Sequence, residues 1–142
     1  RRQRQMCIRD SNPDCVLFTH EPPPAGAELA AWGRALGHHP AFPGGINVEF
    51  AQPISPTGLA VTVWERGSGA TLACGTGACA VAAAAVLTGR CPRDVPILVQ
   101  LPGGTLEVCV QRDDTVLLTG DAAATFSGTV LIQPCKAPRG VV

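Results

Sequence analysis

The chain has 142 residues, of which 46% are hydrophobic and 15% are charged, and this composition excludes an intrinsically disordered protein. Eleven basic residues balance eleven acidic ones, so no net charge favours nucleic acid or an anionic membrane surface as a partner. The most apolar stretch, residues 79–87, is about half as long as a membrane-spanning helix. We therefore expect one soluble domain that binds neither nucleic acid nor membranes.

The first residues of the chain differ in character from the rest. Residues 5–10 read Gln-Met-Cys-Ile-Arg-Asp, which resembles the in-frame translation of a transposase adapter used to prepare DNA sequencing libraries. We interpret residues 1–11 as an artefactual tail and expect the true chain to continue upstream, so that this sequence is part of a larger protein. An ordinary polar N-terminal tail is the alternative. The folded domain is predicted over residues 12–135, followed by a tail at 136–142.

Within that domain, seven stretches have the apolar or alternating composition of strands: residues 15–18, 46–50, 59–64, 95–101, 105–110, 115–119 and 125–132. The strand at 46–50 alternates apolar and polar residues, which is typical of a half-buried strand. Residues 28–36 predict a helix with Gly37 as its C-terminal cap. Pro102-Gly103-Gly104 joins two of the strands as a hairpin.

A second helix is predicted at residues 75–87, where no residue is charged and every side is apolar. A helix of this kind must be surrounded by protein. We therefore predict an α/β (α+β) fold in which an antiparallel or mixed sheet curves around one central hydrophobic helix.

The seven cysteines include no Cys-x-x-Cys pair, and the three histidines complete no zinc pattern, so we predict no metal site. The odd number and irregular spacing of the cysteines favour a reduced, cytoplasmic chain in which most are small buried hydrophobic residues. No Gly-Lys-Ser or Gly-Lys-Thr follows the glycine-rich segment, which excludes a Walker-type phosphate loop.

Cys74 stands immediately before the apolar helix. The first amides of a helix lack intrahelical partners and carry about half a positive charge, which stabilises a thiolate. Gly75 and Gly77 leave these amides open, and the Thr76 hydroxyl adds a donor for a carboxylate or phosphate. The alternative is a buried, unreactive thiol in a tight turn.

Glu65 and Arg66 end the strand that precedes this turn. The carboxylate could take or relay a proton, and the guanidinium could bind a carboxylate through two hydrogen bonds. His20, His38 and His39 lie in loop-like surroundings, and we expect them to be solvated rather than partners of Cys74.

The run Glu65-Arg66-Gly67, followed by residues 71–78 (Thr-Leu-Ala-Cys-Gly-Thr-Gly-Ala), resembles the second signature of diaminopimelate epimerase. Further stretches are similar to the same family, so the resemblance covers residues 12 to about 132: Asn12-Pro13, Phe42-Pro43, residues 46–50, Leu101–Gly104 and Leu118–Gly120. It implies one lobe of a two-lobed fold, in which each lobe wraps a sheet around a central helix. The chain corresponds to the C-terminal lobe.

The resemblance implies a cofactor-independent epimerase that interconverts LL- and meso-diaminopimelate in bacterial lysine and peptidoglycan precursor synthesis. The family uses one cysteine from each lobe: a thiolate removes the α-proton, and a thiol returns one to the opposite face. Cys74 matches the second of these cysteines. The first belongs to the N-terminal lobe, so we expect this chain to be inactive alone, and a homodimer is an open possibility for the full-length parent.

The resemblance also implies roles for individual residues. Cys74 and Glu65 match catalytic positions. Six residues match positions that bind the amino and carboxylate groups of the amino acid: Asn12, Asn47, Glu65, Arg66, Gly75 and Thr76. One departure is Asp14, which replaces the family's histidine and cannot act as a cationic neighbour of a thiolate. Either the sequence is in error there, or this lineage tunes its cysteines differently.

Two other functions remain open. One is a sibling cofactor-free isomerase, such as a proline racemase or a phenazine-type isomerase, against which the Glu65-Arg66-Gly67 run argues. The other is a non-catalytic module that binds amino acids. A second Cys-Gly motif upstream would favour the enzyme.

Overall fold

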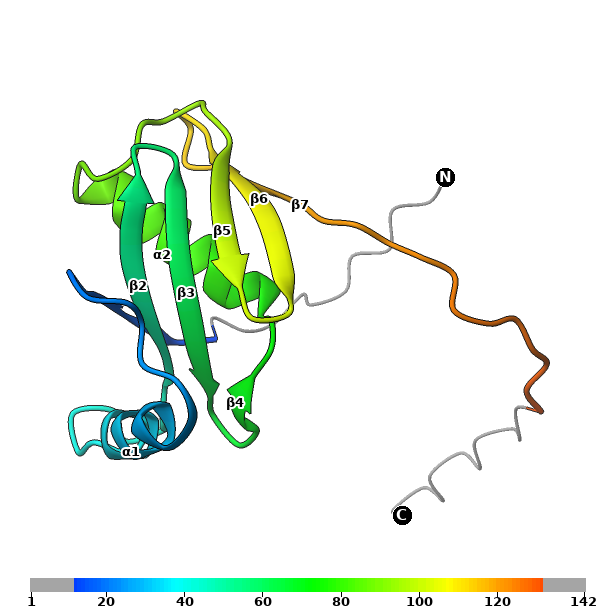
Figure 1. The fold of residues 1–142 in the computed structure, drawn as a ribbon, viewed down its shortest axis with the longest axis horizontal. Helices are drawn as coiled ribbons and strands as arrows, with labels where there is room; N and C mark the ends of the chain where they lie inside the picture. Colours follow the sequence, from blue (N-terminus) through cyan, green and yellow to red (C-terminus); the bar gives the residue numbers. More distant parts are fainter. Residues whose placement is uncertain (1–11, 132–142) are drawn as a thin grey trace, which may run out of the picture.

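The computed structural model describes residues 12–131; the tails predicted at 1–11 and 136–142 lie outside the described residues. Over this range the chain forms seven strands and two helices (Figure 1). Their order is β1 (Asp14–Phe18), α1 (Gly26–Gly37), β2 (Asn47–Ser55), β3 (Gly58–Glu65), β4 (Gly69–Thr71), α2 (Gly75–Leu87), β5 (Ile97–Leu101), β6 (Gly104–Val110) and β7 (Val116–Thr119).

The strands form one mixed sheet in the order β1-β2-β3-β5-β6-β7. β1 runs parallel to β2, β3 runs parallel to β5, and the other neighbours are antiparallel. β5 pairs with residues 58–60 of β3, and the short strand β4 pairs with residues 63–65 at its other end. The mixed sheet predicted from the sequence is confirmed.

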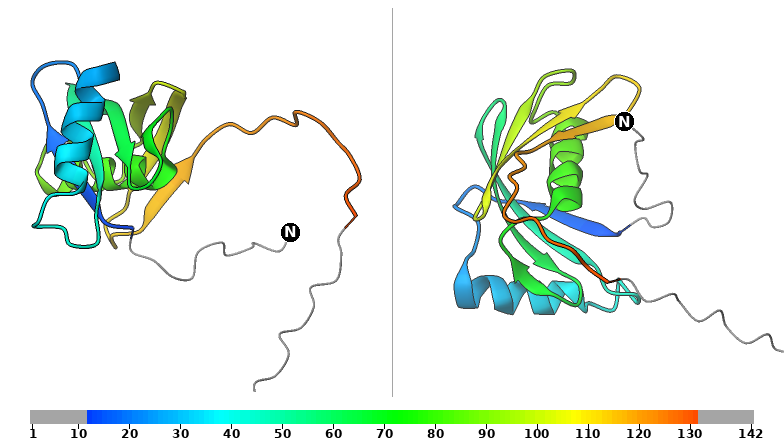
Figure 2. Two further views of the ribbon diagram at one scale, coloured as in Figure 1. Left: turned by 90° about the horizontal axis from the view of Figure 1, so that it is seen from below. Right: turned by 90° about the vertical axis from the view of Figure 1, so that its right-hand side faces the viewer.

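The central helix α2 lies on the concave face of this sheet, which curves around it (Figure 2). It contacts β1, β2, β3, β5, β6 and β7. Ala78, Val81, Ala82 and Ala85 are fully buried against the strands. Their small side chains let the helix approach the sheet closely, and its bounds, Gly75–Leu87, are the predicted ones.

Helix α1 packs on the opposite face, against β2, β3 and β4. The contact depends on Gly33, because a Cβ atom there would clash with the Trp64 ring of β3. The helix begins at Gly26 and ends at Gly37, with His38 in the C-cap position. Gly37 is therefore the last helical residue and not the predicted cap. Neither helix of the described chain is long and apolar enough to cross a membrane.

Because helices cover both faces of β2, one sequence prediction about this strand is wrong. Residues 47–51 are all buried, including Asn47 and Glu49, so the strand is not half-buried. Side chains at 47, 49 and 51 face α2, while Val48 and Phe50 pack with α1. β2 also continues to Ser55, because its antiparallel partner β3 extends the pairing up to Gly58.

A second prediction that fails is the strand at residues 125–132. Residues 125–131 form no strand, and Phe126, Val130 and Leu131 are 88%, 77% and 93% exposed; Ile132 lies outside the described residues. β-branched and aromatic residues favour an extended backbone, but a strand also needs a partner for its amides and carbonyls. This segment leaves the sheet after β7 (Figure 1).

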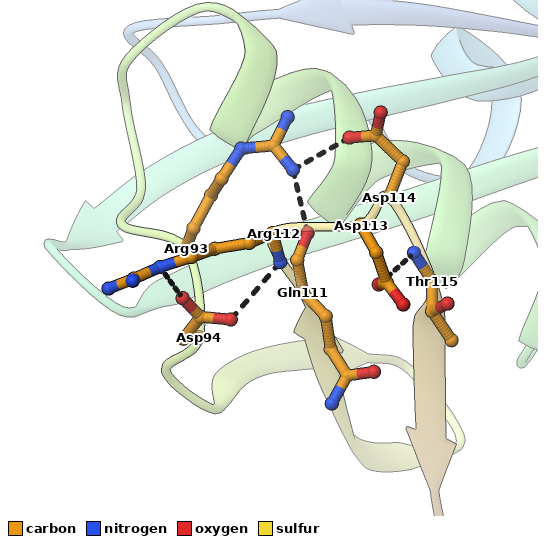
Figure 3. A network of polar contacts seen from close by, with 7 residues as sticks. All are labelled: Arg93, Asp94, Gln111, Arg112, Asp113, Asp114 and Thr115. Atoms are coloured by element: carbon orange, nitrogen blue, oxygen red, sulfur yellow. Dashed lines mark hydrogen bonds and ion pairs between the residues drawn. The ribbon is translucent and has the colours of Figure 1, made fainter.

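At the end of the sheet far from Cys74, a network of ion pairs and hydrogen bonds connects the segment before β5 with the turn between β6 and β7 (Figure 3). Arg93 Nη1 lies 2.7 Å from Asp114 Oδ1 and donates to the Gln111 carbonyl at 2.7 Å. Arg112 Nε donates to Asp94 Oδ2 at 2.7 Å. These contacts fix the segment before β5 against the β6–β7 turn. At the other end of β6, the Gly103 amide donates to the Leu72 carbonyl at 2.7 Å and holds the segment that leads to Cys74.

Candidate functional site

Cys74 is the N-cap residue of α2, with extended backbone (φ −139°, ψ 112°). Its Sγ accepts a hydrogen bond from the Gly77 amide at 3.3 Å and lies 3.4 Å from the Thr76 hydroxyl. The side chain is buried, whereas Thr76 is exposed and Gly75 is partly exposed. The predicted position of Cys74 at the start of a buried helix is confirmed, with the thiol turned toward the helix amides.

Gly77 is the residue that allows this arrangement. A Cβ atom at Gly77 would lie 3.1 Å from Glu49 Oε1 and 3.4 Å from Cys74 Sγ. The absence of a side chain lets the sulfur approach the amide and lets the Glu49 carboxyl lie against the same turn. The first turn of α2 therefore brings Cys74 beside an acid from β2.

Glu65 ends β3 on the face of the sheet that carries α2, two residues beyond the core residue Val63. Its Oε1 accepts a hydrogen bond from the Thr71 hydroxyl at 2.7 Å. Thr71 belongs to β4, a strand that was not predicted from the sequence because it has only three residues. Sequence reasoning quoted Thr71 in the motif but gave it no role; here it orients the carboxylate.

Asn47 connects three strands at this end of the sheet. Its Nδ2 donates to Asp14 Oδ1 of β1 at 2.9 Å, and its Oδ1 accepts from the Arg66 amide at 2.8 Å. The side chain is 2% exposed. Both ends of the amide are therefore engaged within the chain, and in this structure Asn47 holds β1 and the end of β3 in place.

Arg66 and Asn12 lie toward the surface. The Arg66 guanidinium donates to the Gly44 carbonyl at 2.7 Å, and its side-chain methylenes cover Gly45. This holds the charge at the loop before β2. Asn12 is exposed just before β1. The structure thus gathers Glu65, Asn47 and Cys74 on one side of the sheet and leaves these two residues at the edge of that group.

Glu49 is a residue that sequence reasoning missed. It is 0% exposed, and burial raises its pKa to about 8, with smaller contributions from the charge of Asp14, a hydrogen bond with Asp14 and the charge of Glu65. The signal in the sequence was an acidic residue between the two apolar residues Val48 and Phe50. The alternation there placed Glu49 on an exposed face, and only the docking of α2 shows that this face is covered.

The position of these residues can be compared with known proteins. The diaminopimelate epimerase family model matches residues 6–125. The chain belongs to this family. Every predicted site residue, from Asn12 to Thr76, lies within the matched range.

Named members of the family are similar over most of the chain. The diaminopimelate epimerase of Microcystis aeruginosa is 48% identical over 123 residues, which cover 86% of this chain and 42% of the relative. That of Synechococcus elongatus is 47% identical over 119 residues (84% and 41%), and that of Synechococcus sp. strain JA-2-3B'a(2-13) is 49% identical over 131 residues (91% and 45%). The chain spans less than half the length of these curated relatives.

A cavity of about 460 Å³ lies elsewhere, on the face of the sheet that carries α1. Apolar side chains such as Leu17, Trp32 and Phe50 line it, together with Glu21 and Glu28. None of the predicted epimerase-family site residues contributes to it. His20, His38 and His39 are exposed, as expected for solvated residues.

Proposed function

We propose that this chain is one lobe, residues 12–135, of a cofactor-independent diaminopimelate epimerase, which converts LL- to meso-diaminopimelate for lysine and peptidoglycan precursor synthesis. The observation that carries the proposal is Cys74 at the N-cap of α2, with Sγ 3.3 Å from the Gly77 amide, in a chain that belongs to this family. We further propose a cytoplasmic protein, which fits the five free cysteines of the described residues, and a homodimer for the complete enzyme.

In the proposed reaction Cys74 acts from one face of the α-carbon and a cysteine of the other lobe acts from the opposite face. The thiolate forms an S–H bond as the Cα–H bond breaks, and the opposing thiol delivers its proton to the same carbon. Inversion is complete when the configuration has changed and the two sulfurs have exchanged protonation states. The direction of the reaction decides which cysteine is the base.

The start of α2 supports binding of the substrate's α-carboxylate. The amides of the first helical residues, Gly75 and Thr76, lack intrahelical acceptors and lie at the positive end of the helix. The Thr76 hydroxyl is exposed beside them. In this proposal Arg66, Asn12 and Asn47 complete the substrate contacts; Arg66 exchanges its hydrogen bond to Gly44, and Asn47 its hydrogen bond to Asp14, for one to the substrate. Glu65, oriented by Thr71, faces the amino group and tunes the cysteine pair.

The second candidate function is non-catalytic binding of an amino acid. It is favoured for the chain in isolation because the chain spans less than half of each relative and carries one of the two proposed cysteines. A proline-racemase-like isomerase is less well supported, because the Glu65-Arg66-Gly67 run and the named relatives point to diaminopimelate.

The test is α-hydrogen exchange of LL-diaminopimelate in D₂O, followed by NMR, with inversion followed by chiral separation. The complete parent protein should exchange and invert the centre. The 142-residue chain alone should be at least about 10²–10⁴-fold slower, since the opposing acid is missing. Inversion by the chain alone at the parent's rate would refute the two-lobe proposal. A parent that binds the substrate without exchanging its α-hydrogen would favour the non-catalytic binding module instead.

A further inference from the structure

Glu49 is a buried acid that the proposed mechanism does not use. It lies in the middle of β2 with its side chain toward α2, and its exposed fraction is 0%. Oε1 faces Gly77 and lies 3.1 Å from the position that a Cβ atom of this residue would occupy. The carboxyl group is thus packed against the turn of α2 that also holds the Cys74 sulfur.

Among residues 12–131, no group donates a hydrogen bond to either carboxyl oxygen of Glu49. The carboxylate of Asp14 is close enough to raise the pKa of Glu49, and it can only accept hydrogen bonds when ionised. A hydrogen bond between the two acids therefore requires a proton on one of them. Burial of an unpaired charge is costly, so the neutral form of the more buried acid is favoured.

The titratable groups beside Glu49 in the described chain are acids and thiols. The charges of Asp14 on β1 and Glu65 on β3 act on it, and the Cys74 sulfur lies against the same glycine of α2. Burial and the charge of Glu49 raise the pKa of the Cys15 thiol on β1. Burial raises the pKa of the Cys79 thiol, and the charges of Cys74 and Asp14 add to this effect. Each negative charge in this cluster therefore disfavours the ionisation of its neighbours. The most buried acid is the one most strongly favoured to hold a proton.

We propose that Glu49 is a positioning residue whose protonated carboxyl donates a hydrogen bond to Asp14, and that this neutral carboxyl keeps a negative charge away from the Cys74 sulfur. The proposal rests on the proposed function only in giving Cys74 its acid–base role. Asp14, which replaces the histidine of the family pattern, then has a purpose of its own. It accepts the hydrogen bond from the Glu49 carboxyl, and its 2.9 Å contact with the Asn47 amide holds it in place to do so.

The consequence concerns the reactivity of Cys74. When Glu49 ionises, it places a negative charge close to the sulfur, because both groups lie against Gly77. In Glu49→Gln the side chain stays neutral at every pH, keeps nearly the same shape and can still donate to Asp14. At a pH where Glu49 is ionised in the unaltered chain, Cys74 should therefore react faster with an electrophile in Glu49→Gln.

The first measurement is the titration of Glu49 itself by ¹³C NMR of carboxyl-labelled glutamate in the 142-residue chain, with the signal assigned by its loss in Glu49→Gln. Glu49 should be protonated at pH 7. Asp14→Asn removes the acceptor charge and should lower the midpoint of the Glu49 titration by about one pH unit. Glu107→Gln, on β6 and outside this cluster, is the matched control and should leave the Glu49 signal unchanged.

The second measurement is the rate of Cys74 alkylation by iodoacetamide at pH 6.5 and pH 9, read for the Cys74 peptide by mass spectrometry. The ratio of the rate in Glu49→Gln to the rate in the unaltered chain should rise by roughly 10-fold between these pH values, because only the unaltered chain gains a charge beside the sulfur; in Glu107→Gln the ratio should stay constant. Comparing the ratio at two pH values removes any difference in access to the sulfur. Neither measurement depends on epimerase turnover, so failure of the proposed function would leave both results standing.

Two outcomes would overturn the inference. One is a Glu49 carboxyl that is already ionised at pH 7 in the unaltered chain. The other is a ratio of Cys74 alkylation rates between Glu49→Gln and the unaltered chain that is the same at both pH values. If Glu49→Gln fails to fold, Asp14→Asn decides the matter, since a Glu49 midpoint that does not fall in that variant contradicts the hydrogen bond between the two acids.

Discussion

The hydroxyl of Thr71 donates a hydrogen bond of 2.7 Å to Oε1 of Glu65, and this contact joins β4 to the end of β3. The turn between the strands contains Gly67 at φ +87°, a conformation that favours glycine. The hairpin therefore sets the direction of a carboxylate that the proposed mechanism uses. Glu65 is held by a neighbour six residues away in sequence, in a strand too short to be recognised from its pattern.

Thr71→Val removes this donor with little change in shape. A hydrogen bond to a charged group contributes about 1.5–3 kcal/mol, so kcat/KM of the complete protein should fall by roughly 10–100-fold. Thr71→Ser retains the hydroxyl and should recover most of the activity. Steady-state kinetics on both variants make the comparison, and equal losses in Thr71→Val and Thr71→Ser would show that the hydroxyl has no part in orienting Glu65.

Cys74→Ala in the complete protein should abolish racemisation, and Cys74→Ser should leave at most a trace. A serine hydroxyl is far less acidic than a thiol, so a base at this position would almost never be ionised. Cys109→Ser, on β6, is the control and should keep its activity. Circular dichroism establishes folding in each case. A Cys74→Ser enzyme that keeps a large share of the parent's turnover would make Cys74 a structural thiol.

Thr76→Val should raise KM more than it lowers kcat. The exposed hydroxyl beside the first amides of α2 is proposed to contact the substrate carboxylate, which carries the same charge in the ground state and the transition state. Loss of such a contact weakens both states equally. The measurement is a full saturation curve of the complete protein. A fall in kcat at unchanged KM would instead place Thr76 in the chemical step, through its 3.4 Å contact with Cys74 Sγ.

Gly33→Ala should destabilise the fold, although alanine is the better helix former by about 1 kcal/mol. The added methyl would clash with the Trp64 ring, and overpacking of this kind costs roughly 1–3 kcal/mol. Urea unfolding of the 142-residue chain measures the difference. The same substitution in a Trp64→Leu background should cost less, because the clash is then relieved. An equal cost in both backgrounds would exclude the Trp64 contact as the cause.

The stability of the fold should depend on pH through Glu49. Burial raises its folded pKa to about 8 from an ordinary value of 4.5, so the folded state binds the proton more tightly than the unfolded state. The stabilisation is complete below about pH 4.5 and is lost as the pH rises to about 8. At about 1.4 kcal/mol per pKa unit, the loss is at most about 5 kcal/mol.

Urea unfolding at pH 5, 6.5 and 8 measures this dependence, with Glu49→Gln as the reference. The difference in unfolding free energy between the two chains should shift in favour of Glu49→Gln as the pH rises. Groups that titrate in both chains cancel from the difference. A difference that stays constant over this range would mean that Glu49 ionises at its ordinary pH despite its burial.

Local signals determined what the sequence predicted well. A Cys-Gly-Thr-Gly step and the uncharged apolar run after it are properties of neighbouring residues, and they placed α2 at the residues where the structure has it. The same run identified the family, because its residues are contiguous. The curved sheet followed from one requirement, that a helix apolar on all sides must be enclosed.

Long-range packing decided the rest. Asn47 contacts Asp14 and Arg66, which are 33 and 19 residues away, and no local pattern specifies such pairs. The segment at 125–131 has β-branched and aromatic residues typical of a strand but no pairing partner in the described chain. The residues around Glu49 alternate as in a half-exposed strand, yet two helices cover both faces of β2. Whether a polar side chain meets water, and hence whether its carboxyl keeps its proton, depends on elements brought together only in the folded state.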